Sequence, residues 1–109
     1  STPVGDMSEI AAIGRLFGAA PANLSVSGTK SATGHLLGGA GAIEAVASIM
    51  SIKNNVVPAT INTTDLNSQV PKTLDIVLGK AREKKVNVAM SNTFGFGGHN
   101  GIVVFKRLK

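Results

Sequence analysis

A lysine and a histidine stand close together beside a run of glycines, in the segment Gly28–His35 (GTKSATGH). Lys30 supplies a fixed cation, and His35 supplies an imidazole that can donate or accept a proton. Gly38, Gly39 and Gly41 follow, where the helical pattern begins and the first N–H groups of a helix have no internal partner. Such a combination suits a substrate that carries an anion or a carbonyl group.

A second glycine-rich segment, Asn92–Asn100 (NTFGFGGHN), lies near the end of the chain. Its structural interpretation is a tight hairpin turn with one or two phenylalanines in the core. Its functional interpretation is that Gly95 and Gly97 let backbone N–H groups approach a substrate carbonyl, while Phe94 or Phe96 swings as a gate. We interpret His99 as a polar residue of the turn and assign it no catalytic role.

Glu44 is a candidate partner for Lys30, because a buried lysine needs a carboxylate to keep its charge. Taken singly, Lys30 and His35 also fit a surface lysine and a capping histidine. The combination with Gly34, the glycine run and Glu44 is what favours a site. Ser91 and Asn92 offer oxygen ligands that, with Glu44, form a candidate site for a structural cation. Spacing alone supports this cation site weakly.

Composition excludes several classes of function. The chain has no cysteine, so disulfides, thiolate metal sites and a cysteine nucleophile within it are excluded. The net charge is +5, and a solvated surface is its default interpretation. No aromatic residues interleave the basic ones, so if the basic surface has a partner, an acidic carrier protein is favoured over nucleic acid. The glycines around Lys30 lack the order G-x-x-x-x-G-K-[ST] of a phosphate loop. No apolar run has the ~20 residues of a membrane span.

The periodicity of apolar residues predicts the elements that position these groups. A helix is expected from about Met7 to Phe17, with Asp6 and Glu9 at capping-box spacing. A helix with one apolar face is expected after the Lys30 loop, through Ile43, Val46 and Met50 to about Lys53. Strands are expected at residues 24–27, 86–90 and 102–105, and the last of these is expected to be buried on both faces. An irregular region is expected at 54–85, between the second helix and the later strands. This order is α/β without an internal repeat.

These motifs, in this order, resemble the C-terminal part of the elongating β-ketoacyl-acyl carrier protein synthases. The similarity lies in Ser1–Asp6 (STPVGD), in Lys30–Gly38 (KSATGHLLG), in Glu44 and in Asn92–Asn100. It spans essentially the whole chain. The resemblance implies the thiolase-type fold, in which two α/β halves form α-β-α-β-α layers. Residues 1–109 would be a single domain that makes up most of the second half.

The resemblance also implies an acyltransferase of fatty acid biosynthesis that performs decarboxylative condensation of malonyl-acyl carrier protein with an acyl thioester. Lys30 and His35 would be catalytic, and Glu44 would pair with Lys30. Phe96, with Phe94, Gly95 and Gly97 around it, would gate the site and contribute to an oxyanion hole. Thr2 would lie near the substrate. We expect no cofactor.

The family's cysteine and first histidine are absent from this sequence, so we expect the chain to be the C-terminal portion of such an enzyme. Its expected partners are the missing N-terminal half, acyl carrier protein and a second copy in a homodimer. Two alternatives stay open: a non-catalytic fragment that provides packing and a binding surface, and a polyketide-type condensing domain. The bacterial cytoplasm is the expected location, with a plastid or mitochondrion as alternatives.

Overall fold

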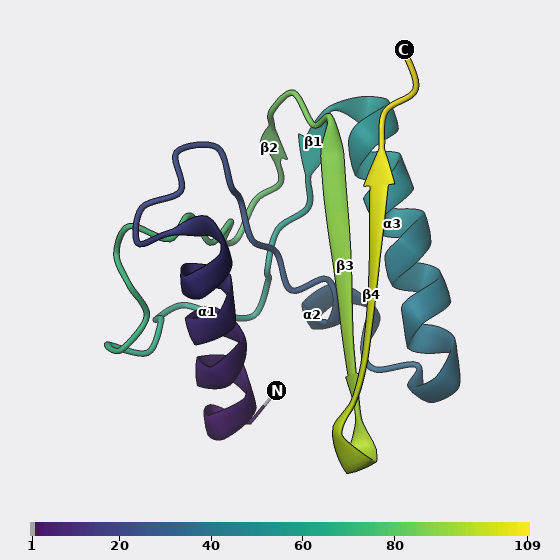
Figure 1. The fold of residues 1–109 in the computed structure, drawn as a ribbon. Coiled ribbons are helices and arrows are strands. Elements are labelled where there is room, and N and C mark those ends of the chain that lie inside the picture. Colours follow the sequence, from purple (N-terminus) through teal and green to yellow (C-terminus); the bar gives the residue numbers. More distant parts are fainter. Residues whose placement is uncertain (1) are drawn as a thin grey trace.

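The computed structural model describes residues 2–109, and Ser1 lies outside the described residues. The structure contains both helices and strands, as the predicted α/β class requires, and the hairpin of β3 and β4 packs beside helix α3 (Figure 1). In chain order the elements are α1 (Pro3–Phe17), α2 (Lys30–Thr33), η1 (Leu37–Gly39), α3 (Ala40–Asn54), β1 (Val56–Val57), β2 (Arg82–Glu83), β3 (Val88–Gly95), η2 (Phe96–Gly98) and β4 (His99–Lys106).

Helix α1 begins four residues before the predicted start. Thr2 is the N-cap: its hydroxyl accepts a hydrogen bond from the Gly5 N–H at 3.0 Å, and Pro3 takes the first helical position. Proline suits this position because it lacks an N–H and its φ is already helical. The predicted cap at Asp6 was therefore wrong, whereas the end at Phe17 is confirmed by Gly18, which adopts φ +86°.

Helix α3 has the predicted extent, but it buries a different face. Ala40, Glu44 and Ile52 are buried, whereas Ile43 and Val46 of the predicted apolar stripe are exposed. Apolar residues lie nearly all round this helix, and such helices are usually enclosed on several sides. Within residues 2–109, α3 packs mainly against β3, with smaller contacts to η1, β1 and β4, and Ile43 and Val46 are left exposed.

Strands β3 and β4 form an antiparallel two-stranded sheet whose register runs from Val88 opposite Lys106 to Gly95 opposite His99. The prediction that residues 102–105 are buried on both faces was wrong. Ile102, Val103 and Val104 are each more than half exposed, because no described residue covers the outer face of β4. Unlike the strands of a closed α/β sheet, this hairpin presents apolar side chains to its surroundings.

The region at 54–85 is more ordered than its composition predicts. β1 pairs antiparallel with β2, and parallel bridges join Val26 to Ile76 and Thr60 to Leu78. The strand predicted at 24–27 is reduced to the first of these bridges. Val77, between the two bridging residues of this region, is only 1% exposed. The segment predicted to be irregular thus supplies part of the core.

A polar network joins this region to residue 25. The Asp75 carboxylate accepts hydrogen bonds from the Ser25 hydroxyl at 2.6 Å and from the Arg82 guanidinium at 2.7 Å. The hydrogen bond from Ser25, followed by the one from Arg82, lowers the pKa of Asp75 from its usual value of 3.8. The ionised form of Asp75 is therefore favoured in the folded protein.

We expect Asp75 to stabilise the folded state above about pH 4 and to lose that contribution as the pH falls through its lowered pKa. The unfolded chain takes up the proton first, so acid favours unfolding. About a third of the Asp75 side chain is exposed, which limits the effect to about 0.5 kcal/mol. Urea unfolding of the full-length protein and of Asp75→Asn between pH 2 and 7 measures it. A variant with the same acid sensitivity as wild type would contradict the prediction.

No helix within residues 2–109 is long and apolar enough to cross a membrane.

Candidate active site

Lys30 and Glu44 form an ion pair between two helices. Lys30 is the first residue of the single-turn helix α2, and Glu44 lies one turn into α3. The Lys30 ammonium donates to Glu44 Oε1. The Glu44 side chain is 9% exposed and that of Lys30 is 38% exposed, so the carboxylate is enclosed while the ammonium reaches the surface. The contact expected from the sequence is therefore present, with the cation on the outer side.

The imidazole of His35 is held in one tautomer. His35 Nδ1 accepts a hydrogen bond from the Leu37 backbone N–H at 2.9 Å. A backbone N–H can only donate, so in the neutral imidazole the proton lies on Nε2. His35 is exposed, which leaves Nε2–H free to meet a ligand. Leu37 adopts φ +49°, an uncommon conformation for a leucine, and this backbone directs its N–H at the histidine.

The turn between β3 and β4 carries the second motif. Gly97 and Gly98 adopt φ +76° and +79°, conformations that residues with a side chain rarely take. Phe96 lies at the tip and its side chain is fully exposed, while Phe94 is about half exposed. Neither ring is a core residue of the described chain, so the structural interpretation of these phenylalanines as core residues was wrong. The exposed ring of Phe96 is free to cover a neighbouring site.

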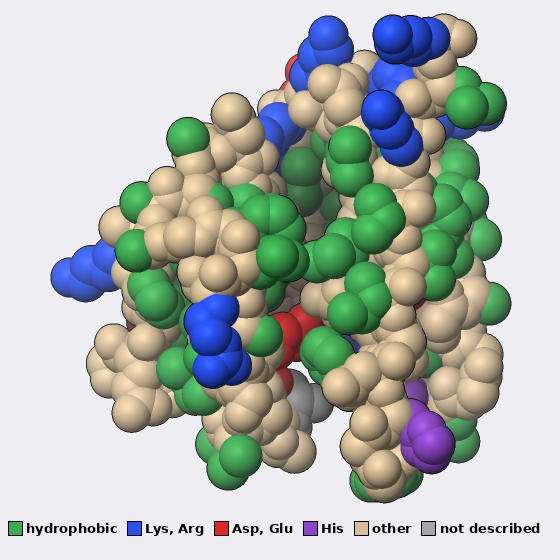
Figure 2. Space-filling model, viewed as in Figure 1, with side chains coloured by type: hydrophobic (Ala, Val, Ile, Leu, Met, Phe, Trp, Pro, Cys, Tyr) green, Lys and Arg blue, Asp and Glu red, His purple; other side chains and the backbone are tan. Residues whose placement is uncertain are grey.

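The two motifs converge at one end of the molecule. A Cβ atom added to Gly41, near the start of α3, would lie 3.7 Å from Thr93 Oγ1 on β3. Gly41 follows the His35 segment closely and Thr93 precedes the turn closely, so this contact places the two motifs beside each other (Figure 1). At this distance a Cβ would make an ordinary van der Waals contact, so the start of α3 and strand β3 lie close together. Histidine side chains gather at this end in Figure 2.

Thr2, Ser91 and Asn92 are less closely tied to this site. The Thr2 hydroxyl acts as the cap of α1, and Asn92 donates its amide N–H to Glu9 of α1 at 3.1 Å. Asn92 Oδ1 and Glu44 Oε2 are buried and have no hydrogen-bond partner among the described residues. No hydrogen bond within residues 2–109 joins Glu44 to Ser91 or Asn92, and no cluster of three His, Asp or Glu side chains in this range could hold a metal.

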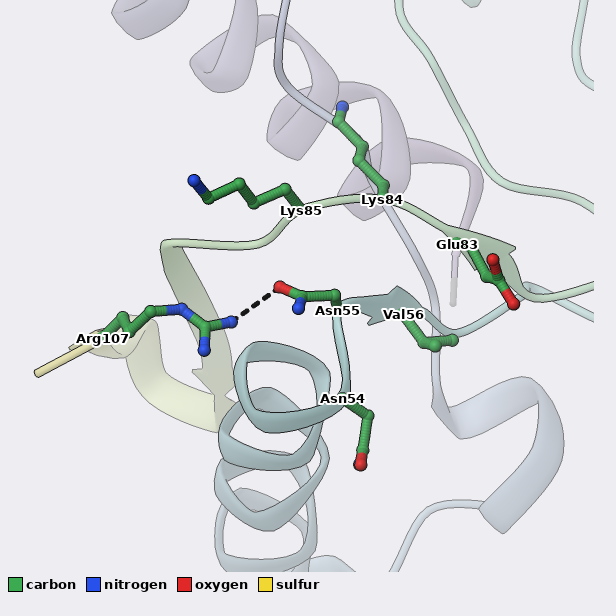
Figure 3. A pocket seen from close by; sticks show the side chains of 7 residues that line it. All are labelled: Asn54, Asn55, Val56, Glu83, Lys84, Lys85 and Arg107. Atoms are coloured by element: carbon green, nitrogen blue, oxygen red, sulfur yellow. Dashed lines mark hydrogen bonds between the residues drawn. The ribbon is translucent and has the colours of Figure 1, made fainter.

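Two hollows of the described surface lie away from Lys30 and His35. One, of about 700 Å³, is lined by basic and amide side chains around Arg107 (Figure 3). Arg107 donates to Asn55 Oδ1 at 2.6 Å and to the Val86 carbonyl at 3.0 Å, so it ties the end of α3 to the hairpin. The hollow lies at the Val88–Lys106 end of the hairpin, about 24 Å along β3 from the turn at ~3.4 Å per residue. The other, of about 480 Å³, is an apolar groove beside α1.

Sequence reasoning missed the residues that support the Lys30 turn. Ser31, Thr60 and Asn62 make hydrogen bonds that join residues 28–31 to residues 60–62. Short polar side chains inside a motif were the available signal. Their partners could not be identified, because about thirty residues separate the two segments.

Residues 1–64 match the family model of the β-ketoacyl synthase C-terminal domain, which is more than half of the chain. The chain belongs to this family. It is 49% identical over all its 109 residues to 3-oxoacyl-[acyl-carrier-protein] synthase 2 of Staphylococcus aureus strain COL, and it covers 26% of that protein. The chain therefore spans about a quarter of the length of the curated relatives it matches.

Solved ketosynthases share the fold. The ishigamide ketosynthase/chain length factor superposes with a TM-score of 0.88 and 31% identity, over 99% of this chain and 26% of that one. A ketosynthase bound to a hexaketide, in complex with a type II polyketide synthase acyl carrier protein, superposes with a TM-score of 0.89. Its sequence identity is 28%, and the match covers 99% of this chain and 26% of that one. The predicted α/β class, the thiolase-type fold and the resemblance to β-ketoacyl synthases are confirmed.

Proposed function

We propose that this chain is the C-terminal part of a β-ketoacyl-acyl carrier protein synthase, an acyltransferase that elongates fatty acids. The observation that carries the proposal is the fixed tautomer of His35, with Nε2–H directed away from the Leu37 N–H. An imidazole in this form donates a hydrogen bond and does not need to carry a charge. The family membership of the chain and the similarity to 3-oxoacyl-[acyl-carrier-protein] synthase 2 support this assignment.

The proposed reaction uses that donor during decarboxylation. The bond between the malonyl carboxylate and the α-carbon breaks, CO₂ leaves, and the electron pair moves onto the thioester oxygen as an enolate. His35 Nε2–H stabilises the developing oxyanion, as does the family's first histidine, which would come from residues outside this chain. The α-carbon then attacks the acyl thioester on a cysteine, and the tetrahedral intermediate collapses to β-ketoacyl product and cysteine thiolate.

Lys30 and the turn have supporting roles in this scheme. The Lys30–Glu44 pair would order the loop that carries His35, and the Lys30 ammonium, on the outer side of the pair, would supply local positive potential. The backbone N–H of Phe96 would contribute to the oxyanion hole for acyl transfer. The side chains of Phe96 and Phe94 would gate access, with Gly95 and Gly97 as flexible points. Thr2 would lie near the substrate at the start of α1.

The remainder of the protein is the first partner that we propose. The chain has no cysteine, so the nucleophile must be supplied from elsewhere. The exposed apolar side chains of α3 and β4 are surfaces that such a domain would cover, including Ile43, Val46 and Ile102. We treat residues 1–109 as one structural unit packed against that part, in a homodimer.

We propose acyl carrier protein as the substrate carrier. One structural relative is a ketosynthase in complex with an acyl carrier protein, which supports this partner. The similar synthases of Staphylococcus aureus and Synechocystis are bacterial proteins, and we propose the bacterial cytoplasm as the location over a plastid or mitochondrion.

We also propose a structural cation held by Glu44, Ser91 and Asn92. The buried oxygens Glu44 Oε2 and Asn92 Oδ1, which accept no hydrogen bond from described residues, fit the hard oxygen ligands that such ions prefer. When bound, the cation would neutralise negative charge at these oxygen ligands and would make this part of the site more rigid. The residues of this chain carry the chemistry without it.

The full-length protein, supplied with malonyl-acyl carrier protein and an acyl thioester, is expected to release CO₂ and form a β-ketoacyl product two carbons longer. Mass spectrometry of the carrier-bound product and counting of labelled CO₂ measure both steps. A reaction without malonyl substrate is the control. Absence of both products would favour the non-catalytic alternative, and repeated extension without reduction would favour the polyketide type.

A further inference from the structure

Lys30 lies on a helix that cannot hold its shape alone. Helix α2 has only four residues, and no side chain caps its N-terminus. An isolated single turn is unstable because nucleation fixes several residues for one hydrogen bond. The direction of Lys30 therefore depends on contacts from outside the turn.

Residues 60–62 provide these contacts. The Gly28 N–H donates to Thr60 Oγ1 at 2.8 Å, and the Ile61 N–H donates to Ser31 Oγ at 2.9 Å. Asn62 Nδ2 donates to the Ser31 carbonyl at 3.0 Å. We call Ser31, Thr60 and Asn62 the clamp. Both sides of the Lys30 turn are thus joined to one distant segment.

The clamp is anchored in the core. The Thr60 N–H donates to the Val77 carbonyl at 2.8 Å, and the Gly79 N–H donates to the Thr60 carbonyl at 2.9 Å. Val77 is the most buried apolar residue of the core. The position of Thr60 is therefore determined by the core. The hydrogen bonds of the clamp in turn hold the Lys30 turn in place relative to Thr60.

Asn62 also determines where α2 ends. In a continuing helix the Ser31 carbonyl would accept the His35 N–H. Here it accepts the Asn62 amide, and the chain leaves the helix at Gly34, which adopts φ +74°. Asn62 itself adopts φ +61°, a conformation that asparagine tolerates better than most residues. One side chain thus replaces the helical donor and releases His35 toward the site.

We propose that Ser31, Thr60 and Asn62 are positioning residues that set the geometry of Lys30 and His35 for decarboxylation. This inference rests on the proposed function and assigns a role to the region between α3 and β3. A misplacement of a catalytic group by about 1 Å costs on the order of a hundredfold in rate. Loss of one clamp bond is expected to cost about tenfold, since the remaining bonds persist.

The test uses Asn62→Gly and Thr60→Val in the full-length protein. Glycine keeps the positive φ and removes the amide, whereas valine keeps the shape of threonine and removes the acceptor. Each is expected to lower kcat for CO₂ release from malonyl-acyl carrier protein about tenfold, with the rate of acyl loading onto the cysteine and the KM for the acyl donor unchanged. Thr60→Ser retains the oxygen and should restore kcat.

Thr64→Ala is the matched control. Thr64 lies in the same loop, and among described residues its hydroxyl contacts only Asp65, at 3.5 Å. It should behave as wild type. Equal losses of acyl loading and decarboxylation, in step with a lower melting temperature, would show a merely structural role and overturn the proposal. Unchanged decarboxylation in Asn62→Gly and Thr60→Val would overturn it as well.

Lys30→Ala separates this proposal from the proposed function. If Lys30→Ala slows CO₂ release but the clamp variants do not, the clamp proposal fails and the function stands. If Lys30→Ala releases CO₂ at the wild-type rate, the role of Lys30 in the proposed function fails, and so does the part of the clamp proposal that concerns Lys30.

Discussion

His35→Ala in the full-length protein is expected to slow malonyl decarboxylation by about 10²- to 10³-fold, as loss of one oxyanion donor typically does. Alanine removes the Nε2–H that the Leu37 N–H holds in place through Nδ1. The chemical step loses a donor that acts on charge developing in the transition state, so kcat should fall more than KM rises. Counting labelled CO₂ in single-turnover experiments measures this rate directly.

The other histidine serves as the control for this experiment. His99 lies at the start of β4, and its ring packs near Gly97 on the turn. His99→Ala is expected to change decarboxylation only a few-fold, since no role in charge stabilisation is assigned to it. A His35→Ala enzyme that decarboxylates as fast as wild type would remove the proposed role of His35. Equal, large losses in both variants would point to a general effect on this end of the molecule.

Lys30→Met is expected to destabilise the full-length protein by about 2 kcal/mol. It leaves the Glu44 carboxylate buried without its cation, and an unpaired buried charge is strongly unfavourable. The partial exposure of Lys30 keeps the cost below that of a fully buried pair. Glu44→Gln is expected to cost less, because the remaining ammonium reaches solvent. Urea unfolding at pH 7 compares the two variants.

The double variant Lys30→Met/Glu44→Gln controls for the ion pair. It removes both charges, so most of the stability lost in Lys30→Met should return. An additive loss would show that the two residues do not interact. Replacing the metal salts of the buffer with tetramethylammonium chloride, in the presence of a chelator, adds a test of the proposed cation. The melting temperature of wild type should fall and that of Glu44→Gln should not, because ligand binding stabilises only the protein that binds it.

Local patterns allowed good prediction of some elements. The end of α1 at Gly18 and the helix after the Lys30 loop follow from residue types a few positions apart. The start of α1 was mispredicted although Thr2 and Pro3 are a recognised cap and first residue. Asp6 and Glu9 offered a competing capping signal with the same local strength. Short-range energies alone could not rank the two.

The buried face of α3 and the exposure of β4 depended on what surrounds them. Ile43 and Ile102 have the hydrophobicity of core residues, yet both are exposed within the described chain. Their apolar character predicts that they are covered, but it does not identify the covering surface. Val77, from a region of weak pattern, is almost fully buried because bridges on either side hold it inside.

The sequence by itself determined the chemical groups of the site and the family to which they belong. Lys30, His35, Glu44 and the glycines of the turn are recognisable from residue type and spacing, since each acts through its own functional group. Only the tertiary structure decided the tautomer of His35, the meeting of Gly41 with Thr93 and the clamp from residues 60–62. The tautomer depends on the positive φ of Leu37, a backbone conformation that a leucine does not predict. The other two features join segments distant in the chain, and local propensities carry no information about which distant segments meet.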